Sequence, residues 1–274
     1  MIEFRSISKT FPDGTTAVDD FSLQLPSHQT TVFVGSSGCG KTTLLRMINR
    51  MVDASSGELE IDGENISTIE PVKLRRRIGY VMQNSGLLPH RRVIDNIATV
   101  PRLNGVPKKE AHARALELMD TVGLDRSMAE RYPAQLSGGQ QQRVGVARGL
   151  AVDPNILLMD EPFGAVDPIV RADLQQELLR LQRELDKTVV FVTHDIDEAF
   201  LLGDQVVILE KGARIAQKGS PEEILANPAS DFVASFIGAD RGKRALSIRE
   251  VDGSSILVDG DGNVAGALTE EGTA

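Results

Sequence analysis

The stretch Gly35-Ser36-Ser37-Gly38-Cys39-Gly40-Lys41-Thr42 fits the pattern G-x-x-x-x-G-K-[ST]. It stands between an apolar, β-branched segment at 30–34 and a segment with helical spacing at 42–50. Glycines let the backbone wrap closely around an anion, and the N–H groups at a helix start point toward it. We therefore expect a phosphate-binding loop. Lys41 should reach the β- and γ-phosphates of a nucleotide, and the Thr42 hydroxyl should bind Mg²⁺.

The loop and its cysteine each have an alternative interpretation. It can be read as a plain flexible turn before a helix, which the full spacing and the strand–loop–helix context disfavour. Cys39 can be read as a redox-active thiol, but we interpret it as a small residue that fills the loop. The following helix should bury one face, to which its apolar side chains contribute: Leu44, Leu45, Ile48 and Met51.

Two carboxylates, Asp160 and Glu161, directly follow an apolar run in the stretch Ile156-Leu157-Leu158-Met159-Asp160-Glu161. Ligands of open α/β sheets bind at the carboxyl ends of the strands, where these two carboxylates would stand. We expect Asp160 to bind Mg²⁺, directly or through water, and Glu161 to act as the general base toward water. A strand that merely ends in two solvated acids is the alternative, which the phosphate-binding loop in the same chain disfavours.

Composition limits the class of protein. The 274 residues carry a net charge of -9, with 41% hydrophobic residues, so nucleic acid is not the expected partner. We find no signal peptide and no run of about 20 apolar residues, so we expect a soluble protein that reaches a membrane only through partners. One cysteine allows no internal disulfide and no cysteine-based metal cluster, which suits a reducing cytoplasm.

Apolar strands and helices alternate along most of the chain. Besides 30–34, we expect strands around a turn within 1–25 and at 57–62, 77–82, 156–159, 189–192 and 206–209. Helices should cover 138–152 and 171–185, and the region 84–136 is rich in charged residues and has helical spacing. This order predicts an α/β fold with a mixed, mainly parallel sheet covered on both faces.

The stretch Leu136-Ser137-Gly138-Gly139-Gln140, followed by Gln141-Gln142-Arg143, resembles the signature of ABC-type ATPases. Physically it is a second anion-binding helix start, because Ser137 can cap the helix and the glycines expose N–H groups; an ordinary capped helix is the alternative. The resemblance covers about 1–238. It implies an ABC ATPase domain at 1–240, with a P-loop NTPase core, an N-terminal antiparallel β part and a helical subdomain at about 84–153.

Other positions match the family in order. Phe11 resembles the aromatic that stacks on adenine, although a turn or core aromatic is an alternative. Gln83 resembles the Q-loop glutamine, Ala165-Val166-Asp167 the D-loop and His194 the switch histidine; a solvated glutamine and a structural histidine are the alternatives. The resemblance implies that Glu161, His194 and Gln83 are catalytic and that Thr42, Gln83 and Asp160 bind the metal. ATP would be bound by Phe11, by each residue from Gly35 to Thr43 (Thr43 included) and by Ser137, Gly138, Gly139 and Gln140.

The family pattern also implies partners. The chain should form a homodimer or pair with another ATPase subunit, so that each signature completes the other protomer's site. It should work under two membrane-spanning permease subunits, at the cytoplasmic face of the inner membrane, with an extracytoplasmic substrate-binding protein acting indirectly. Residues 84–98 should form part of the groove for the membrane subunit. Importers of other solutes, such as methionine, polyamines or metals, and non-transport ATPases are the alternatives.

Two features near the end refine this expectation. Residues 231–242 resemble importers of quaternary amines such as glycine betaine, choline, carnitine and proline betaine, and proline itself is a further expected solute. Residues 254–269, within an extension at 241–274, resemble the strand–turn–strand of a truncated CBS motif. Asp259, Asp261, Asn263 and Glu270 fall at EF-hand spacings, but Val264 replaces the required glycine, so we interpret this segment as a polar turn.

Overall fold

The computed structural model describes residues 1–164, 167–238, 247–251, 254–258 and 264–267. Its N-terminal part is an antiparallel sheet in the order β2-β1-β4-β5. The strands are β1 (Ile2–Thr10), β2 (Thr16–Leu25), β4 (Ser56–Ile61) and β5 (Glu64–Asn65). The expected turn between the first two is present, since the Phe11 N–H donates to the Thr15 carbonyl and the Gly14 N–H to the Phe11 carbonyl. Within this sheet, Phe4 and Phe21 pack edge to face with centroids 5.2 Å apart.

The central sheet has six strands in the order β10-β9-β3-β8-β7-β6. Five run parallel and β10 is antiparallel to β9. The bounds are β3 (Thr30–Gly35), β6 (Ile78–Val81), β7 (Ile156–Asp160), β8 (Thr188–Thr193), β9 (Gln205–Glu210) and β10 (Arg214–Gly219). The expected mixed, mainly parallel sheet is confirmed. Strand β10 is not among the strands predicted from the sequence.

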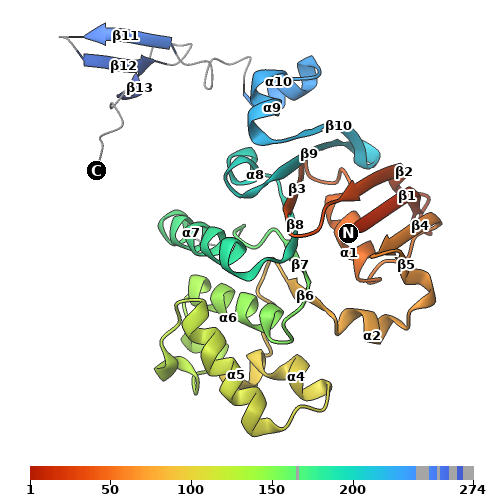
Figure 1. Ribbon diagram of the computed structural model, residues 1–274, viewed down its shortest axis with the longest axis vertical. Coiled ribbons are helices and arrows are strands. Elements are labelled where there is room, and N and C mark those ends of the chain that lie inside the picture. The colour runs from red at the N-terminus through yellow and green to blue at the C-terminus, as the bar shows by residue number, and fades with distance from the viewer. Residues whose placement is uncertain (165–166, 239–246, 252–253, 259–263, 268–274) are drawn as a thin grey trace.

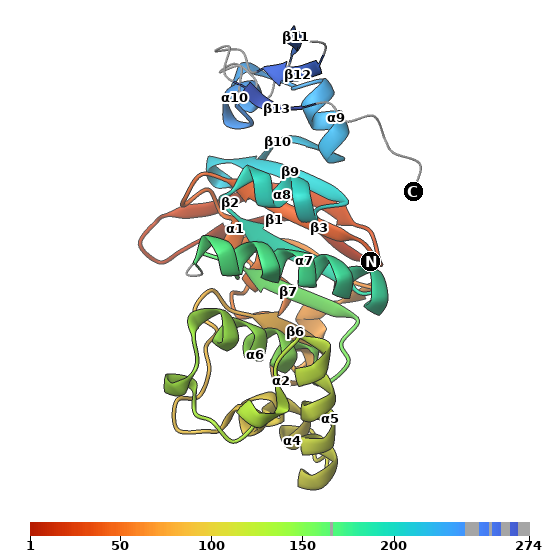
Figure 2. The same ribbon diagram turned by 90° about the vertical axis from the view of Figure 1, so that its left-hand side faces the viewer.

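Both faces of this sheet are buried, and alternate residues of β3 show it. Val32 and Val34 belong to one apolar cluster, together with residues of α6 (Gly138–Leu150) and α7 (Pro168–Leu185). Phe33 belongs to the other cluster, together with residues of α1 (Lys41–Ile48) and of the antiparallel sheet. Figures 1 and 2 show the antiparallel strands on one side of the central sheet, and α7 and α8 (Ile196–Leu202) on the other. This covering explains why β3, β7 and β8 are buried along their whole length and mostly apolar, rather than alternating between buried and exposed residues.

Helices cover the sheet and form an insertion between β6 and β7. The insertion contains α3 (Val93–Ile97), α4 (Thr99–Leu103), α5 (Lys108–Thr121) and α6 (Gly138–Leu150), all below β6 and β7 in Figure 2. The other helices are α1 (Lys41–Ile48), α2 (Pro71–Arg75), α7 (Pro168–Leu185), α8 (Ile196–Leu202), α9 (Pro221–Ala226) and α10 (Asp231–Phe236). Short 3₁₀ turns lie at Ile66–Thr68, Arg126–Met128, Pro133–Gln135 and Lys211–Ala213.

A third sheet lies near the end of the chain. It is antiparallel and consists of β11 (Ser247–Val251), β12 (Ser254–Val258) and β13 (Val264–Ala267). Asp259, Asp261, Asn263 and Glu270, which we interpret as part of a polar turn, lie outside the described residues. Across the described segments, none of the helices combines the length and the apolar character needed to span a bilayer.

One expectation about α1 is wrong. Met51 does not share the buried face of this helix: α1 ends at Ile48, and Met51 is 51% exposed. Arg50 adopts a left-handed backbone conformation (φ 54°), which ends the helical periodicity before Met51 is reached. Met47 is buried in its place.

Candidate nucleotide site

The expected phosphate loop joins β3 to α1. Lys41 is only 4% exposed, and its Nζ donates to the carbonyl oxygens of Gly35 (2.7 Å) and Ser36 (2.9 Å). Ser36, Ser37 and Gly38 are exposed, and they lie directly before the first N–H groups of α1. The loop therefore combines exposed residues at a helix start with a buried cation inside it, which is an anion-binding geometry.

Two glycines of this loop are required by packing. A Cβ on Gly35 would lie 2.3 Å from the Leu209 carbonyl oxygen, and one on Gly40 would lie 2.4 Å from that of Ala17. Gly40 also has φ 114°, a conformation that side chains oppose. Cys39 is buried with its Sγ 3.8 Å from Lys41 Nζ, which fits the interpretation as a filling residue.

Asp160 ends β7 and lies beside the loop. Its Oδ1 accepts a hydrogen bond from the Thr42 hydroxyl at 2.9 Å. Its Oδ2 accepts from the Tyr80 hydroxyl at 3.0 Å and lies 3.3 Å from Arg46 Nη2. Burial, with Asp160 nearby, raises the pKa of Tyr80 to about 12, so the phenol stays protonated and donates at physiological pH. The carboxylate is thus fixed from both sides.

These oxygens fit Mg²⁺. The ion prefers hard oxygen ligands and usually takes one or two protein groups, with waters and substrate phosphates completing its shell. The Thr42 hydroxyl and the Asp160 carboxylate touch each other at the mouth of the loop. Asp160 is 5% exposed, so a cation there would meet a carboxylate that is already desolvated.

Two further predicted residues contact Glu161. The Glu161 Oε2 atom accepts from Gln83 Nε2 at 3.2 Å and lies 3.2 Å from His194 Nδ1. These side chains come from the ends of β7, β6 and β8, which are adjacent in the sheet. Glu161 has φ 44°, a conformation that costs a non-glycine residue about 1–2 kcal/mol, and its N–H is held by the Val192 carbonyl at 2.9 Å. The hydrogen bond to β8 therefore keeps the backbone of Glu161 in a strained conformation, which fixes where its side chain starts.

The signature residues lie apart from this cluster. Ser137 caps α6: its Oγ accepts from the Gln140 N–H at 3.3 Å, and Gln140 Oε1 accepts from the Ser137 N–H at 3.0 Å. Ser137 and Gly138 are exposed, while Gly139 is buried. In the part of the chain that the structure describes, no hydrogen bond joins these residues to the phosphate loop or to Glu161.

The remaining predicted positions are only partly placed. Phe11 is half-buried in the β1–β2 turn, with Lys9 Nζ 5.3 Å from the centre of its ring. Ala165 and Val166 lie outside the described residues. Asp167 is exposed, and its carbonyl accepts from the Arg171 N–H at 2.8 Å. Thr43 is half-buried in the first turn of α1.

Sequence reasoning missed the two residues that fix Asp160. A signal for Arg46 exists, because it stands four residues after Thr42 and therefore on the same face of α1. Tyr80 gives no such signal: it contacts Asp160 only because β6 and β7 are neighbours, which the spacing along the chain does not reveal.

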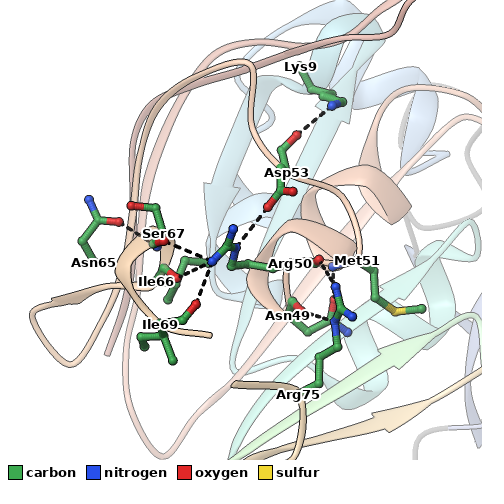
Figure 3. A network of polar contacts seen from close by, with 10 residues as sticks. All are labelled: Lys9, Asn49, Arg50, Met51, Asp53, Asn65, Ile66, Ser67, Ile69 and Arg75. Atoms are coloured by element: carbon green, nitrogen blue, oxygen red, sulfur yellow. Dashed lines mark hydrogen bonds and ion pairs between the residues drawn. The ribbon is translucent and has the colours of Figure 1, made fainter. Parts of the chain in front are cut away.

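A network of arginines anchors the far end of α1. Figure 3 shows the Arg50 guanidinium donating to the carbonyls of Ile66, Ser67 and Ile69 at 2.8–3.2 Å. Arg75, at the end of α2, donates to the Asn49 carbonyl at 3.2 Å and to that of Arg50. Because α2 leads directly into β6, the network ties the helix that begins at Lys41 to the strand that precedes Gln83.

We expect Arg50→Met to lower the free energy of unfolding by about 2 kcal/mol, because it leaves carbonyls that are partly buried without donors. Urea unfolding of the chain without nucleotide measures the effect. Arg183→Met is the matched control, since Arg183 is exposed on α7 and has no side-chain partner among the described residues. A change within about 0.5 kcal/mol of the control, which is the usual range of surface substitutions, would contradict this role.

Comparison with known proteins agrees with this geometry. The family model described as "ABC transporter" matches residues 18–164. The glycine betaine/carnitine/choline transport ATP-binding protein OpuCA of Bacillus subtilis is 51% identical over 88% of this chain and 63% of its own length. The glycine betaine uptake system ATP-binding protein YehX of Escherichia coli is 50% identical over 92% of this chain and 81% of its own.

A solved structure gives the same result for the fold. The ATP-binding cassette MJ0796, a dimer in a post-hydrolysis state bound to ADP and Pi, aligns with a TM-score of 0.72 and 32% identity. The alignment covers 81% of this chain and 99% of that one. The α/β fold with its helical insertion is therefore that of the ATP-binding cassettes.

The chain belongs to the ABC transporter family. The resemblance found in the sequence is thereby confirmed. The chain spans less than two thirds of the length of the first curated relatives that it matches, at 60–63% of each.

Proposed function

We propose that the chain binds ATP with Mg²⁺ and hydrolyses it to drive a transporter. The observation that carries the proposal is the convergence of two clusters at one edge of the sheet. One is the contact between Thr42 and Asp160 beside the loop of Lys41, and the other is Gln83 and His194 around Glu161. The first cluster suits phosphate and metal, and the second suits a water molecule.

Each residue has a distinct task in this proposal. Lys41 exchanges its loop carbonyls for phosphate oxygens. Thr42, Asp160 and Gln83 hold Mg²⁺, which neutralises charge on the phosphates. Glu161 Oε2 is held by its two neighbours, whereas Oε1 accepts no hydrogen bond within the described residues and is available to take a proton from water. His194, which is exposed, is placed to contact the γ-phosphate.

The exposed helix start at Ser137 supports a head-to-tail dimer. One nucleotide needs one phosphate-binding helix start, and this chain has two that do not contact each other through hydrogen bonds in its described part. In the dimer, Ser137, Gly138 and Gly139 of one protomer close over the ATP of the other, and Gln140 supports Ser137 through the capping pair. Phe11 and the segment ending in Asp167 complete the site from the two sides.

A groove on the helical insertion supports the membrane partner. A cavity of about 530 Å³ is lined by Leu88, Arg91, Arg92, Thr99 and Tyr132, among others, and overlaps the segment 84–98. We propose that two permease subunits dock there, at the cytoplasmic face of the inner membrane, and that a substrate-binding protein acts outside.

The proposed domain boundaries follow the same family pattern. Residues 1–240 are the ATPase domain, with the helical subdomain at about 84–153, and 241–274 form an extension.

The proposed cargo is a quaternary amine. Both OpuCA and YehX are named for glycine betaine, and OpuCA also for carnitine and choline. The segment 231–242 carries the same resemblance. Proline and proline betaine belong to the same expected group. An importer for another small solute is the second candidate, and a non-transport ATPase is the third.

ATP hydrolysis by the chain in lipid vesicles, reassembled with its neighbouring permease subunits and binding protein, tests the proposal. Glycine betaine, choline, carnitine, proline, methionine and spermidine are compared. We expect a quaternary amine to stimulate hydrolysis severalfold. Stimulation by methionine or spermidine alone would keep the transporter and overturn the cargo. Hydrolysis that no solute stimulates would favour the non-transport ATPase.

A further inference from the structure

A second cavity, of about 500 Å³, lies away from the nucleotide site. Its lining includes Ile78 and Ile156, the first residues of β6 and β7, which pair with each other. Asp160 ends β7, and four residues of extended strand span about 13 Å. The cavity is therefore at the amino ends of these strands, whereas the proposed ATP site is at their carboxyl ends. Its volume is in the usual range of small-molecule sites.

Four segments of the fold form its walls. Asp62 and Glu64 come from the β4–β5 turn, and Arg76 and Arg77 directly follow α2. Asn104, at the end of α4, contributes from the helical insertion. An occupant would therefore bridge the insertion and the sheet. The loop 152–155, which follows the signature helix α6, completes the wall.

The charges of the lining are unevenly satisfied. Asp62 is paired with the Met1 amino group, and Asp153 with Lys187 Nζ at 2.8 Å. Of the carboxylates, Glu64 alone has no partner within the described residues. The guanidinium groups of Arg76 and Arg77 likewise make no hydrogen bond or ion pair with any described residue. The lining thus carries two unpaired cations and one unpaired anion, so the cavity has an excess of free donors.

The rest of the lining sets the class of ligand. Apolar side chains of Ile61, Ile69, Leu74 and Ile156 form much of the wall. The amides of Asn104 and Asn155 add neutral hydrogen-bonding groups. Guanidinium groups bind carboxylate and phosphate through paired, charge-assisted hydrogen bonds. We propose that this cavity binds a small organic anion, with Arg76 and Arg77 holding its carboxylate or phosphate group and the apolar wall contacting its carbon frame.

Thermal unfolding of the full chain tests the proposal, at constant ionic strength adjusted with sodium chloride. The probes are inorganic phosphate, glycerol 3-phosphate, succinate and citrate. We expect at least one to raise the unfolding temperature to a plateau. In the double variant Arg76→Gln/Arg77→Gln, the half-saturating concentration should rise at least about tenfold, because two charge-assisted donors are lost. The probe that acts distinguishes a carboxylate ligand from a phosphate ligand.

Two controls locate the effect. Arg183→Gln changes an exposed arginine of α7 in the same way, and it should respond like the parent chain. Lys41→Ala should keep the response, because the phosphate loop is not the site. The proposal is overturned if no probe gives a plateau, if the double variant responds like the parent, or if Lys41→Ala abolishes the response. None of these readouts depends on ATP hydrolysis, so the proposed function stands or fails separately.

Discussion

Glu161→Gln is expected to lower steady-state ATP hydrolysis at least about a hundredfold while leaving ATP binding intact. A general base contributes about 10²–10⁴ to rate, and an amide cannot take a proton from water. Glutamine keeps the size of the side chain and an oxygen for the contacts with Gln83 and His194, so the cluster should persist. Phosphate release by the purified chain, measured with excess Mg²⁺ and ATP, checks the rate.

The same variant should accumulate an ATP-bound dimer, because the step that reopens it is blocked. Light scattering behind a sizing column, with and without ATP, measures this. Glu210→Gln is the control, since Glu210 also ends a strand, β9, but two strands separate β9 from β7, and Glu210 is paired with Arg214. A Glu161→Gln chain that stays monomeric in both conditions, or hydrolyses at the parent rate, would remove Glu161 from the role of base.

Much of this site could be predicted because its residues follow buried strands. Gln83, Glu161 and His194 each stand just after an apolar run, and parallel strands bring such ends together at one edge. The chain alone does not give the strand order, however. The order depends on contacts between residues that are distant in sequence. These contacts place β3 between β9 and β8 and make β6 and β7 neighbours. Tyr80 was missed for this reason.

Other misses have local causes. The strand β10 is only half-buried and mixed in character, so neither alternation nor an apolar run marks it. The face of α1 was extended to Met51 because helical periodicity continues in the sequence. In the structure, Arg50 binds the 66–69 carbonyls and turns the backbone away, which no spacing rule predicts. Propensity is overridden there by tertiary hydrogen bonds.

Lys41→Ala is expected to weaken nucleotide binding about 10- to 100-fold. The lysine is buried at the start of α1 and its ammonium lies within the loop, so its loss removes charge-assisted contacts to phosphate. It also leaves the Gly35 carbonyl without its 2.7 Å donor. Titration of the chain with a fluorescent ATP analogue in the presence of Mg²⁺ measures the dissociation constant.

A loss of folding has to be separated from a loss of binding. Lys41 also holds its own loop, so the variant is compared with the parent by circular dichroism and thermal unfolding without nucleotide. Lys218→Ala, at an exposed position of β10, is the control for removal of one positive charge. If Lys41→Ala is folded and weakened while Lys218→Ala binds normally, the ammonium group itself contacts the nucleotide. A folded Lys41→Ala chain with parental affinity would instead mean that Lys41 holds only the loop, and that the backbone donors carry the phosphate alone.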